Sequence, residues 1–374
     1  VDLGQAERCA ILAHALDLLK PVLPKSTYEK AIAQMRTRVF LPYLAGGENW
    51  SGNNWNAVCN GCTTRAVLAL EPDKKIRARF LEASERTAPY YLNGFAPDGY
   101  CGEGLDYWNY GYSRFITWGL DVRRATGGAV DLFKLPRARE AMAYAYTFAL
   151  EPFKAPRVSD GSASVPSTGI LALGRLAWPD LTCERAETFA LLTGGLDNLA
   201  NRALDTESVN LYLKPNRRPY VLPPRTWFPD AQFYFGRPAG AEAVPFSACV
   251  KGGHNGVPHN HNDAGQYIIA LGGTQVVQDP SGKKYDLDTF GPKRYHSPML
   301  NSYGHAVPYP AGLLQNPGRE FGAQILSTDF TDARDVFELD LRGAYPADAN
   351  LKTLTRRLTY DRANASVELV DRVA

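Results

Sequence analysis

The sequence predicts an α+β chain, with a helical first half followed by an antiparallel β-rich second half. In the first half, apolar residues recur at helical spacing, and Pro or Gly ends most of the runs. In the second half, alternating apolar and polar residues are typical of strands. The proline-rich stretch 216–238 lies between the two patterns and resembles a linker that runs into a first strand. We therefore expect two domains, 1–215 and 216–374, with the boundary at roughly 205–225.

The composition is that of a globular protein and gives no indication of a nucleic-acid or membrane partner. The 374 residues include 45% hydrophobic residues, which is enough for sizeable cores, and the net charge of +2 does not indicate a nucleic-acid partner. No apolar run is long enough for a transmembrane helix, so no membrane partner is expected. Cys59 and Cys62 form a CxxC without a second pair, which favours buried free thiols. The chain starts at Val1 without a leader, so we expect a processed or trimmed chain.

The helical half predicts a bundle or an α/α toroid, because helices follow one another without intervening strands. Ser26 with Glu29 three residues later forms a predicted capping box. No repeat of fixed period is visible, so a regular solenoid is not expected. The predicted helices are 6–19, 26–44, 57–70, 73–91, 105–126, 136–150, 168–178 and 181–192.

The second half predicts an antiparallel sandwich. Residues 266–271 and 274–277 are two β-rich runs joined by Gly272 and Gly273, which is the pattern of a hairpin. Further strands are predicted at 336–342 and 354–360. The last run, 365–374, is predicted to be a strand with no closing partner.

Histidines cluster in this second half. The chain has six, and only His14 lies outside residues 251–305. Imidazole suits both proton transfer near neutral pH and the binding of first-row metals. His259 and His261 are two residues apart, so on an extended strand both would point to the same face. The other clustered members are His254, His296 and His305.

The hairpin predicts a metal site. It would return Asp279 to the level of His261, 18 residues earlier, and His305 follows after a loop. Two imidazoles and a carboxylate form a zinc-type ligand set, which other divalent ions also tolerate. The alternative is a glycine-rich turn whose His and Asp side chains make ordinary hydrogen bonds.

Two loops of the helical half are rich in polar and aromatic residues. Residues 49–56, followed by Asn60, carry amides that could clamp a carboxylate, although Asn is also a favoured residue at the start of a helix. Tyr107, Tyr110 and Tyr112 are predicted to open a helix, whose positive dipole end would stabilise a phenolate. A packing role is the alternative for these tyrosines.

Several motifs occur in one order along the chain: NNWNAVCNG, DGYCGEGLDYWNYG, WFPDAQFYFGRP, HNHNDAG, QDPSGKKY and SYGHAV. Together they resemble the heparinase II/III-like polysaccharide lyases, which include heparin, heparan sulfate and alginate lyases. The resemblance covers most of 45–310 and implies an incomplete α/α toroid followed by an antiparallel β-sandwich, with the active site in the cleft between them. Both domains are expected to be partial here. Cys62 stands where Gly is expected, and Trp55 stands where some members have His.

The resemblance implies β-elimination on a uronic-acid polysaccharide, which leaves 4,5-unsaturated uronate ends. Asn54 matches the residue that neutralises the sugar carboxylate, with Asn60 as the second choice. Tyr107 matches the tyrosine that protonates the leaving oxygen, and Tyr110 is the alternative acid. His259 matches the catalytic histidine.

The resemblance also implies one divalent metal, Zn²⁺, with a mainly structural role, and His261, Asp279 and His305 match its ligands. It further implies a periplasmic or secreted protein that acts on an acidic polysaccharide or oligosaccharide. The residues predicted to bind this substrate are Asn60, Tyr110, Arg294 and Tyr295.

Two other functions stay open from the sequence. A glycoside hydrolase could use Glu103 and Asp106 as its acid and base. A non-catalytic carbohydrate-binding protein would keep only the metal site. The sequence leaves open which polysaccharide is bound, whether action is endo or exo, and the oligomeric state.

Overall fold

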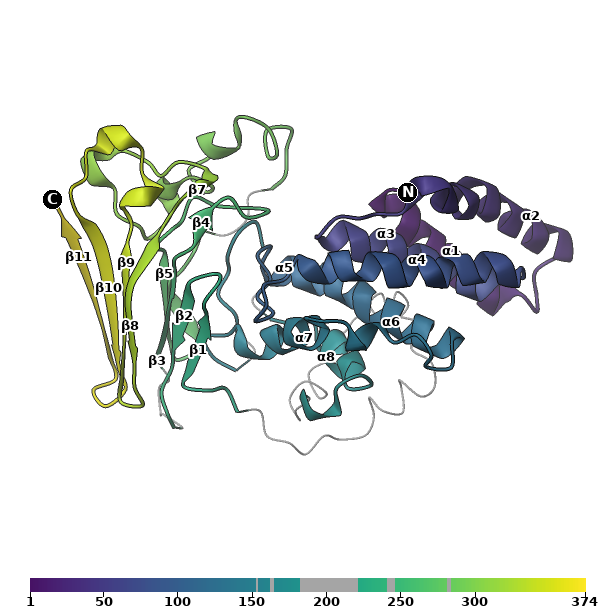
Figure 1. Ribbon diagram of the computed structural model, residues 1–374, viewed down its shortest axis with the longest axis horizontal. Coiled ribbons are helices and arrows are strands. Elements are labelled where there is room, and N and C mark those ends of the chain that lie inside the picture. The colour runs from purple at the N-terminus through teal and green to yellow at the C-terminus, as the bar shows by residue number, and fades with distance from the viewer. Residues whose placement is uncertain (153, 162–164, 182–220, 241–245, 281–283) are drawn as a thin grey trace. The chain divides into compact units, whose positions relative to one another are not determined.

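The computed structural model describes residues 1–152, 154–161, 165–181, 221–240, 246–280 and 284–374, and the chain falls into two compact units (Figure 1). Unit 1 contains Val1–Phe95, Tyr107–Ala143 and Ser167–Tyr220. Unit 2 contains Ala96–Asp106, Tyr144–Pro166 and Val221–Ala374, so it takes two segments from the predicted helical half. The predicted boundary at 215 and most of the predicted helix 181–192 lie outside the described residues.

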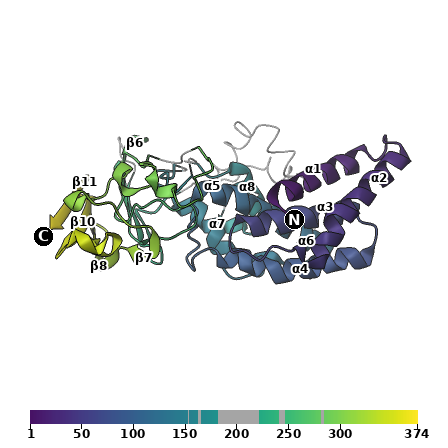
Figure 2. The same ribbon diagram turned by 90° about the horizontal axis from the view of Figure 1, so that it is seen from above.

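Unit 1 is built from helices around α3, which packs against α1, α4 and α6 (Figure 2). Most side chains of α3 are buried, since neighbouring helices contact it on several sides. The described helices are α1 (Leu3–Leu19), α2 (Lys25–Met35), α3 (Asn54–Leu70), α4 (Lys74–Asn93), α5 (Leu105–Tyr107), α6 (Ser113–Ala125), α7 (Ala138–Thr147) and α8 (Thr168–Gly174). The last residues of α7 and the first two of α5 belong to unit 2.

Aromatic side chains fill the cores of both units. In unit 1, Tyr43 stacks on Phe80 with ring centroids 4.7 Å apart, and both rings are fully buried. Trp118 donates its indole N–H to the Ser84 hydroxyl at 2.9 Å, so the polar end of this buried ring is satisfied. The high aromatic content of the sequence is thus used largely for packing.

Three details of the helices differ from the sequence prediction. The predicted cap at Ser26 is wrong, because α2 begins at Lys25 after Pro24 and no side chain caps it. α3 begins three residues earlier than predicted, and the Asn53 side chain caps it by accepting from the Trp55 N–H at 3.1 Å. The predicted helix 105–126 is interrupted by the π-helical turn Trp108–Tyr112, and such turns are often found at functional sites.

Unit 2 is a sandwich of antiparallel sheets. A five-stranded sheet has the order β1-β2-β3-β5-β6, a four-stranded sheet has the order β11-β10-β9-β8, and β4 pairs with β7. The strands are β1 (Arg225–Phe228), β2 (Phe233–Gly236), β3 (Phe246–Lys251), β4 (His254–Asn255), β5 (Tyr267–Leu271), β6 (Thr274–Val277), β7 (Gly318–Gly322), β8 (Gln324–Phe330), β9 (Arg334–Asp340), β10 (Leu354–Asp361) and β11 (Ser366–Val373).

The two larger sheets share one apolar core. Tyr234 and Val250 of the five-stranded sheet pack in a cluster with Phe337, Leu339 and Leu358 of the four-stranded sheet. Along β10 the inward-facing residues alternate with more exposed ones, as expected for a strand with one buried face. The predicted helical region followed by an antiparallel sandwich is confirmed.

The predicted hairpin is confirmed as β5 and β6, and Gly272 and Gly273 form its turn with φ values of 57° and 84°. Both values lie in the left-handed region, which glycine adopts without strain. The prediction that the last strand has no partner was wrong, because β11 pairs with β10 along its whole length. None of the described helices is long and apolar enough to cross a membrane.

Candidate active site and metal centre

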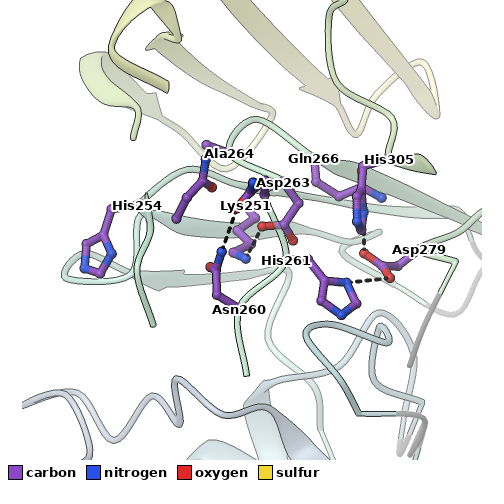
Figure 3. A network of polar contacts seen from close by, with 12 residues as sticks. Lys251, His254, Asn260, His261, Asp263, Ala264, Gln266, Asp279 and His305 are labelled. Atoms are coloured by element: carbon purple, nitrogen blue, oxygen red, sulfur yellow. Dashed lines mark hydrogen bonds and ion pairs between the residues drawn. The ribbon is translucent and has the colours of Figure 1, made fainter. Parts of the chain in front are cut away.

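The three predicted metal ligands meet in unit 2. His261, Asp279 and His305 are buried, and one donor atom from each lies within 4.8 Å of the other two. Asp279 follows β6, as the hairpin predicted, and His305 follows a short 3₁₀ turn. His305 Nδ1 lies 3.1 Å from Asp279 Oδ2, and His261 Nδ1 lies 3.8 Å from Asp279 Oδ1 (Figure 3).

The chemistry of this triad fits a divalent cation. Within the described part of the chain, two buried ring nitrogens, His261 Nδ1 and His305 Nε2, have no hydrogen-bond partner. A buried polar atom without a partner costs free energy, which a coordinated cation would remove. Ligand atoms of a tetrahedral zinc site lie about 3.3 Å apart, and the partnerless His261 Nδ1 lies 3.8 Å from Asp279 Oδ1. The residues can therefore hold a metal, and their type suits zinc.

The charge on His305 is set by its carboxylate neighbour. Burial of the ring opposes protonation, but the hydrogen bond and the charge of Asp279 outweigh burial and raise the pKa of His305. Nearby, Lys251 forms a buried ion pair with Asp263. Figure 3 shows this pair beside the triad, so one further buried carboxylate and one buried amine lie next to it.

His259 lies beside the metal triad, in contact with a carboxylate that the sequence analysis missed. His259 Nδ1 lies 3.0 Å from Asp160 Oδ2, and His261 Nε2 lies 3.1 Å from Asp160 Oδ1. The two imidazoles do face one carboxylate, but not through the alternation of a strand. Residues 259–261 form no strand, and His259 has a φ of 57°. Left-handed backbone at a residue other than glycine is strained and is common at functional sites.

Asp160 is held as a carboxylate. Burial raises its pKa, but hydrogen bonds from His259, His261 and Arg294 outweigh burial and hold the pKa well below its usual range. Arg294 Nη2 donates to Asp160 Oδ1 at 2.7 Å, and the Tyr285 hydroxyl donates to Oδ2 at 3.2 Å. One nearly inaccessible carboxylate thus accepts from two imidazoles, a guanidinium and a phenol.

A second carboxylate approaches His259 from the other side of the ring. His259 Nε2 lies 3.6 Å from Glu103 Oε1, so the imidazole lies between Glu103 and Asp160. Half-exposed Tyr285 stacks with His259 at a centroid distance of 6.3 Å, and exposed Phe290 meets the ring edge-on at 5.4 Å. Flanking carboxylates stabilise an imidazolium, and exposed aromatic rings suit contact with a sugar.

Arg294 and Tyr295 directly contact the loop 259–261, which carries His259 and His261. Arg294 donates from Nε and Nη2 to the Asn260 carbonyl and from Nη1 to the Thr289 carbonyl. The Tyr295 hydroxyl lies 3.3 Å from the Asn260 side-chain nitrogen, which donates to it. This geometry fits residues that hold the loop in place. The predicted contact of both residues with substrate stays a prediction.

The remaining two clustered histidines take no part in the triad. His254 lies on β4, where its Nδ1 accepts from the Gly256 N–H at 3.2 Å. Burial, followed by the charges of Arg319 and Lys251, lowers the pKa of His254. His296 belongs to the 3₁₀ turn Arg294–His296. The cluster in the sequence therefore separates into three histidines at the site and two outside it.

In unit 1, Asn54 lies against the π-helical turn that follows Tyr107. Asn54 is buried in the first turn of α3. A methyl group added at Gly111 would lie 2.9 Å from Asn54 Cβ, so only glycine allows this approach without displacement. The Asn54 segment and the segment containing Tyr107 are therefore brought side by side within one unit, as a shared role requires.

Asn60 is committed to the protein framework. Its Oδ1 accepts from the Tyr43 hydroxyl and the Asn49 N–H, each at 3.0 Å. Its Nδ2 donates to the Asn49 carbonyl and to Asn56 Oδ1. With both donors and both acceptor positions occupied in a fully buried residue, this geometry does not favour the predicted substrate contact, which stays a prediction.

The other two tyrosines that were predicted to open the helix have packed surroundings, and the acid role and substrate contact of Tyr110 stay predictions. Tyr112 is fully buried, and its hydroxyl donates to the Ala138 carbonyl. Burial, followed by the charge of Glu140, raises its pKa well above the usual value. Tyr110 packs towards α1, and burial with the charge of Glu7 raises its pKa. The prediction that the helix dipole stabilises a phenolate is therefore wrong for Tyr112, whose role is to pack in the core.

The fold matches solved polysaccharide lyases. A heparinase III gene product with methylated lysines aligns at a TM-score of 0.66 and 13% identity over 100% of this chain and 53% of its own. Heparinase III aligns at a TM-score of 0.65 and 14% identity, over 98% of this chain and 55% of its own. Heparan sulfate lyase HepC from Pedobacter heparinus aligns at a TM-score of 0.56 and 14% identity, over 93% of this chain and 49% of its own. The chain thus has their fold and spans about half their length. No protein-family model and no curated protein matches the sequence.

Proposed function

We propose that the chain acts as a polysaccharide lyase, which cleaves a uronic-acid-containing acidic polysaccharide by β-elimination. The observation that carries the proposal is the arrangement at His259, whose imidazole lies between Asp160 and Glu103 beside a metal-type triad. This arrangement occurs in a chain with the fold of heparinase III. A fold shared at 14% identity does not by itself imply an activity, so the support for the proposal comes from the residues of the site.

The reaction needs three groups around one sugar ring. A base removes the proton on C5, next to the carboxylate, and the C–H electrons form a double bond between C4 and C5. The bond from C4 to the glycosidic oxygen breaks, and an acid protonates that oxygen. Because the C5 proton is weakly acidic, neutral donors must also stabilise the charge that develops on the carboxylate. No water is added to the products.

His259 is the proposed base. An imidazole that takes a proton becomes a cation, and the carboxylates of Asp160 and Glu103 would stabilise that cation. A positioned general base contributes a factor of about 100 to 10,000 to the rate. The exposed rings of Tyr285 and Phe290 beside His259 would form an apolar wall against one face of the sugar.

Asn54 is the proposed donor to the sugar carboxylate, and Tyr107 is the proposed acid. Their support is the packing of Asn54 on Gly111, four residues after Tyr107. Tyr107 also follows Glu103 by only four residues, so their Cα atoms are at most about 14 Å apart by covalent geometry alone. The proposal requires Asn54, Tyr107 and His259 to meet on one sugar ring.

His261, Asp279 and His305 would hold one divalent metal, for which zinc is the proposed ion. Bound there, the cation would neutralise Asp279 and fix the loops that carry both histidines, which is a structural role. The proposed location is the periplasm or the outside of the cell, where such polysaccharides are met.

The test is an assay for the 4,5-unsaturated uronate, by its ultraviolet absorbance, on a panel of heparin, heparan sulfate and alginate. The expected result is a rise in absorbance on at least one substrate. His259→Ala should lower the rate about 100- to 10,000-fold. The matched control is His254→Ala, which removes a neighbouring imidazole outside the triad and should leave the rate within about threefold.

Each outcome decides between the candidate functions. Cleavage without ultraviolet absorbance would indicate a hydrolase, for which Glu103 and Asp106 are the candidate carboxylates. Binding without cleavage across the whole panel would favour a carbohydrate-binding protein. Cleavage with absorbance that survives His259→Ala would remove the histidine from the mechanism.

A further inference from the structure

Asp160 links the proposed base to the metal triad through a single side chain. Its two oxygens point at different imidazoles, Oδ2 at His259 Nδ1 and Oδ1 at His261 Nε2. Its side chain is only 1% exposed, so water does not compete for these contacts. Neither the chemistry proposed above nor the metal ligand set requires a carboxylate at this position.

The contacts with Asp160 determine where the ring protons lie. An ionised carboxylate can only accept hydrogen bonds, so each ring nitrogen that faces it must carry a proton. His259 is thereby held with its proton on Nδ1 and with Nε2 directed to the side of Glu103. His261 is held with its proton on Nε2, which leaves Nδ1, the nitrogen that faces Asp279, able to bind a cation.

The backbone around Asp160 reinforces this orientation. The Asp160 N–H donates to the His259 carbonyl at 3.3 Å, so the two residues are joined by both main chain and side chain. Ser159 and His259 both have left-handed backbone, with φ values of 56° and 57°. One of these residues precedes Asp160 and the other is hydrogen-bonded to it, and strained backbone persists only where surrounding contacts determine the conformation.

We propose that Asp160 is a positioning residue that sets the tautomers of His259 and His261 together, and so couples metal binding to the orientation of the base. The inference rests on the proposed function only where catalysis is measured. A carboxylate that orients a metal-bound imidazole through its second nitrogen changes metal affinity by about 10- to 100-fold.

A purely structural role is the alternative, because Asp160 also forms an ion pair with Arg294 at 2.7 Å. In that case Asp160 would hold Arg294 and its loop in place, and its contacts with the two imidazoles would affect neither their tautomers nor metal binding. Arg294→Lys separates the two roles. It removes the guanidinium contacts with Asp160 and with the Asn260 carbonyl, but it puts no new donor or acceptor against either imidazole. The tautomers of His259 and His261 should therefore stay as in wild type.

The first measurement needs no variant and no substrate. Long-range proton–nitrogen NMR spectra of the whole chain report which ring nitrogen of each histidine carries the proton. The expected pattern is Nδ1–H for His259 and Nε2–H for His261. If His259 instead carries its proton only on Nε2, the inference is overturned, whatever the fate of any variant.

The second measurement compares Asp160→Asn with Arg294→Lys. An amide keeps the shape of the side chain but presents a donor to one of the two rings, so that ring must change its tautomer. Zn²⁺ titrated against a competing chelator should bind about 10- to 100-fold more weakly to Asp160→Asn, and within about threefold of wild type to Arg294→Lys. The absorbance of bound Co²⁺ should change in Asp160→Asn alone.

Catalysis gives the third measurement and separates two kinds of failure. If the wild type is a lyase, Asp160→Asn should lower kcat at least about 100-fold with KM within about threefold, because a misoriented base weakens the chemical step rather than binding. If the wild type is inactive but the tautomers and the Zn²⁺ affinity behave as expected, the proposed function fails and the inference stands. Equal Zn²⁺ affinity and tautomers in wild type and Asp160→Asn would overturn the inference.

Discussion

Replacing Gly111 with alanine tests whether the packing of Asn54 matters for the reaction. Gly111 belongs to the π-helical turn Trp108–Tyr112. An added methyl would lie 2.9 Å from Asn54 Cβ and 3.0 Å from the Tyr91 hydroxyl, whereas ordinary contacts begin at 3.4 Å. Either Asn54 or the helical turn must therefore move by about half an ångström or more.

The size of the effect follows from this displacement. Overpacking a core by one methyl costs about 1–3 kcal/mol, and replacing glycine by alanine in a helix returns about 1 kcal/mol. The net loss of stability should therefore be small, on the order of 1 kcal/mol. A misplacement of about 1 Å near the reacting groups can cost about 100-fold in rate, so we expect kcat to fall about 10- to 100-fold.

The assay is the rate of unsaturated uronate formation, measured together with thermal unfolding. Gly119→Ala is the matched control, because its methyl would lie 2.6 Å from the Phe133 ring in the same part of unit 1, away from Asn54. The control should lose stability but keep its kcat in the folded state. A folded Gly111→Ala protein with wild-type kcat would refute the role given to Asn54.

Three further changes test other residues. Tyr107→Phe should abolish elimination and leave the protein folded, because the ring is retained. Tyr90→Phe is the control, and turnover of Tyr107→Phe near wild type would remove Tyr107 as the acid. His261→Ala should lose the bound metal by elemental analysis and unfold at a lower temperature than His254→Ala, since a ligand of a structural site contributes folding free energy. Burial raises the pKa of Cys62 from 9.0 to about 11, so the protonated thiol stabilises the fold below pH 9 and this contribution is lost as the pH rises towards about 11. Denaturant titrations at about pH 8 and about pH 11 give the free energy of unfolding at each pH. Between these two pH values it should fall less in Cys62→Ala than in wild type, and an equal fall in both proteins would contradict the assignment to Cys62.

The parts of the fold that the sequence predicted well are those with local causes. The hairpin β5–β6 was located closely because its two glycines are needed for a turn with positive φ. The hairpin in turn placed Asp279 with His261. By contrast, the capping pattern at Ser26 failed because α2 already begins at Lys25, directly after Pro24. A local pattern is misleading when a stronger neighbouring signal competes with it.

Asp160 was missed because its contacts are not local. It lies 99 residues before His259 and 134 residues before Arg294 along the chain. Its own surroundings, a short run of Ser, Asp and Gly, carry no periodic signal. One indirect signal was present: two histidines and an arginine in one region need a carboxylate to balance them when buried. That argument predicts a partner but cannot say which carboxylate supplies it.

Similarly, the sequence could not separate framework amides from ligand-binding amides. Asn53, Asn54 and Asn60 lie within eight residues of each other. In the structure the Asn53 side chain caps α3, and the Asn60 side chain is hydrogen-bonded in the core. Asn54 instead packs on Gly111. Residue type is the same at all three positions, so only the tertiary contacts separate their roles.

The central claim, elimination rather than hydrolysis, is tested most directly by digestion in heavy-oxygen water. A hydrolase adds the oxygen of one water molecule at each cleaved bond, whereas elimination adds none, because the leaving oxygen already belongs to the sugar. Mass spectrometry of the products should find no heavy oxygen at the new ends and should find one unsaturated end for each cleavage. Products that carry one heavy oxygen per cleavage, without unsaturation, would contradict the account.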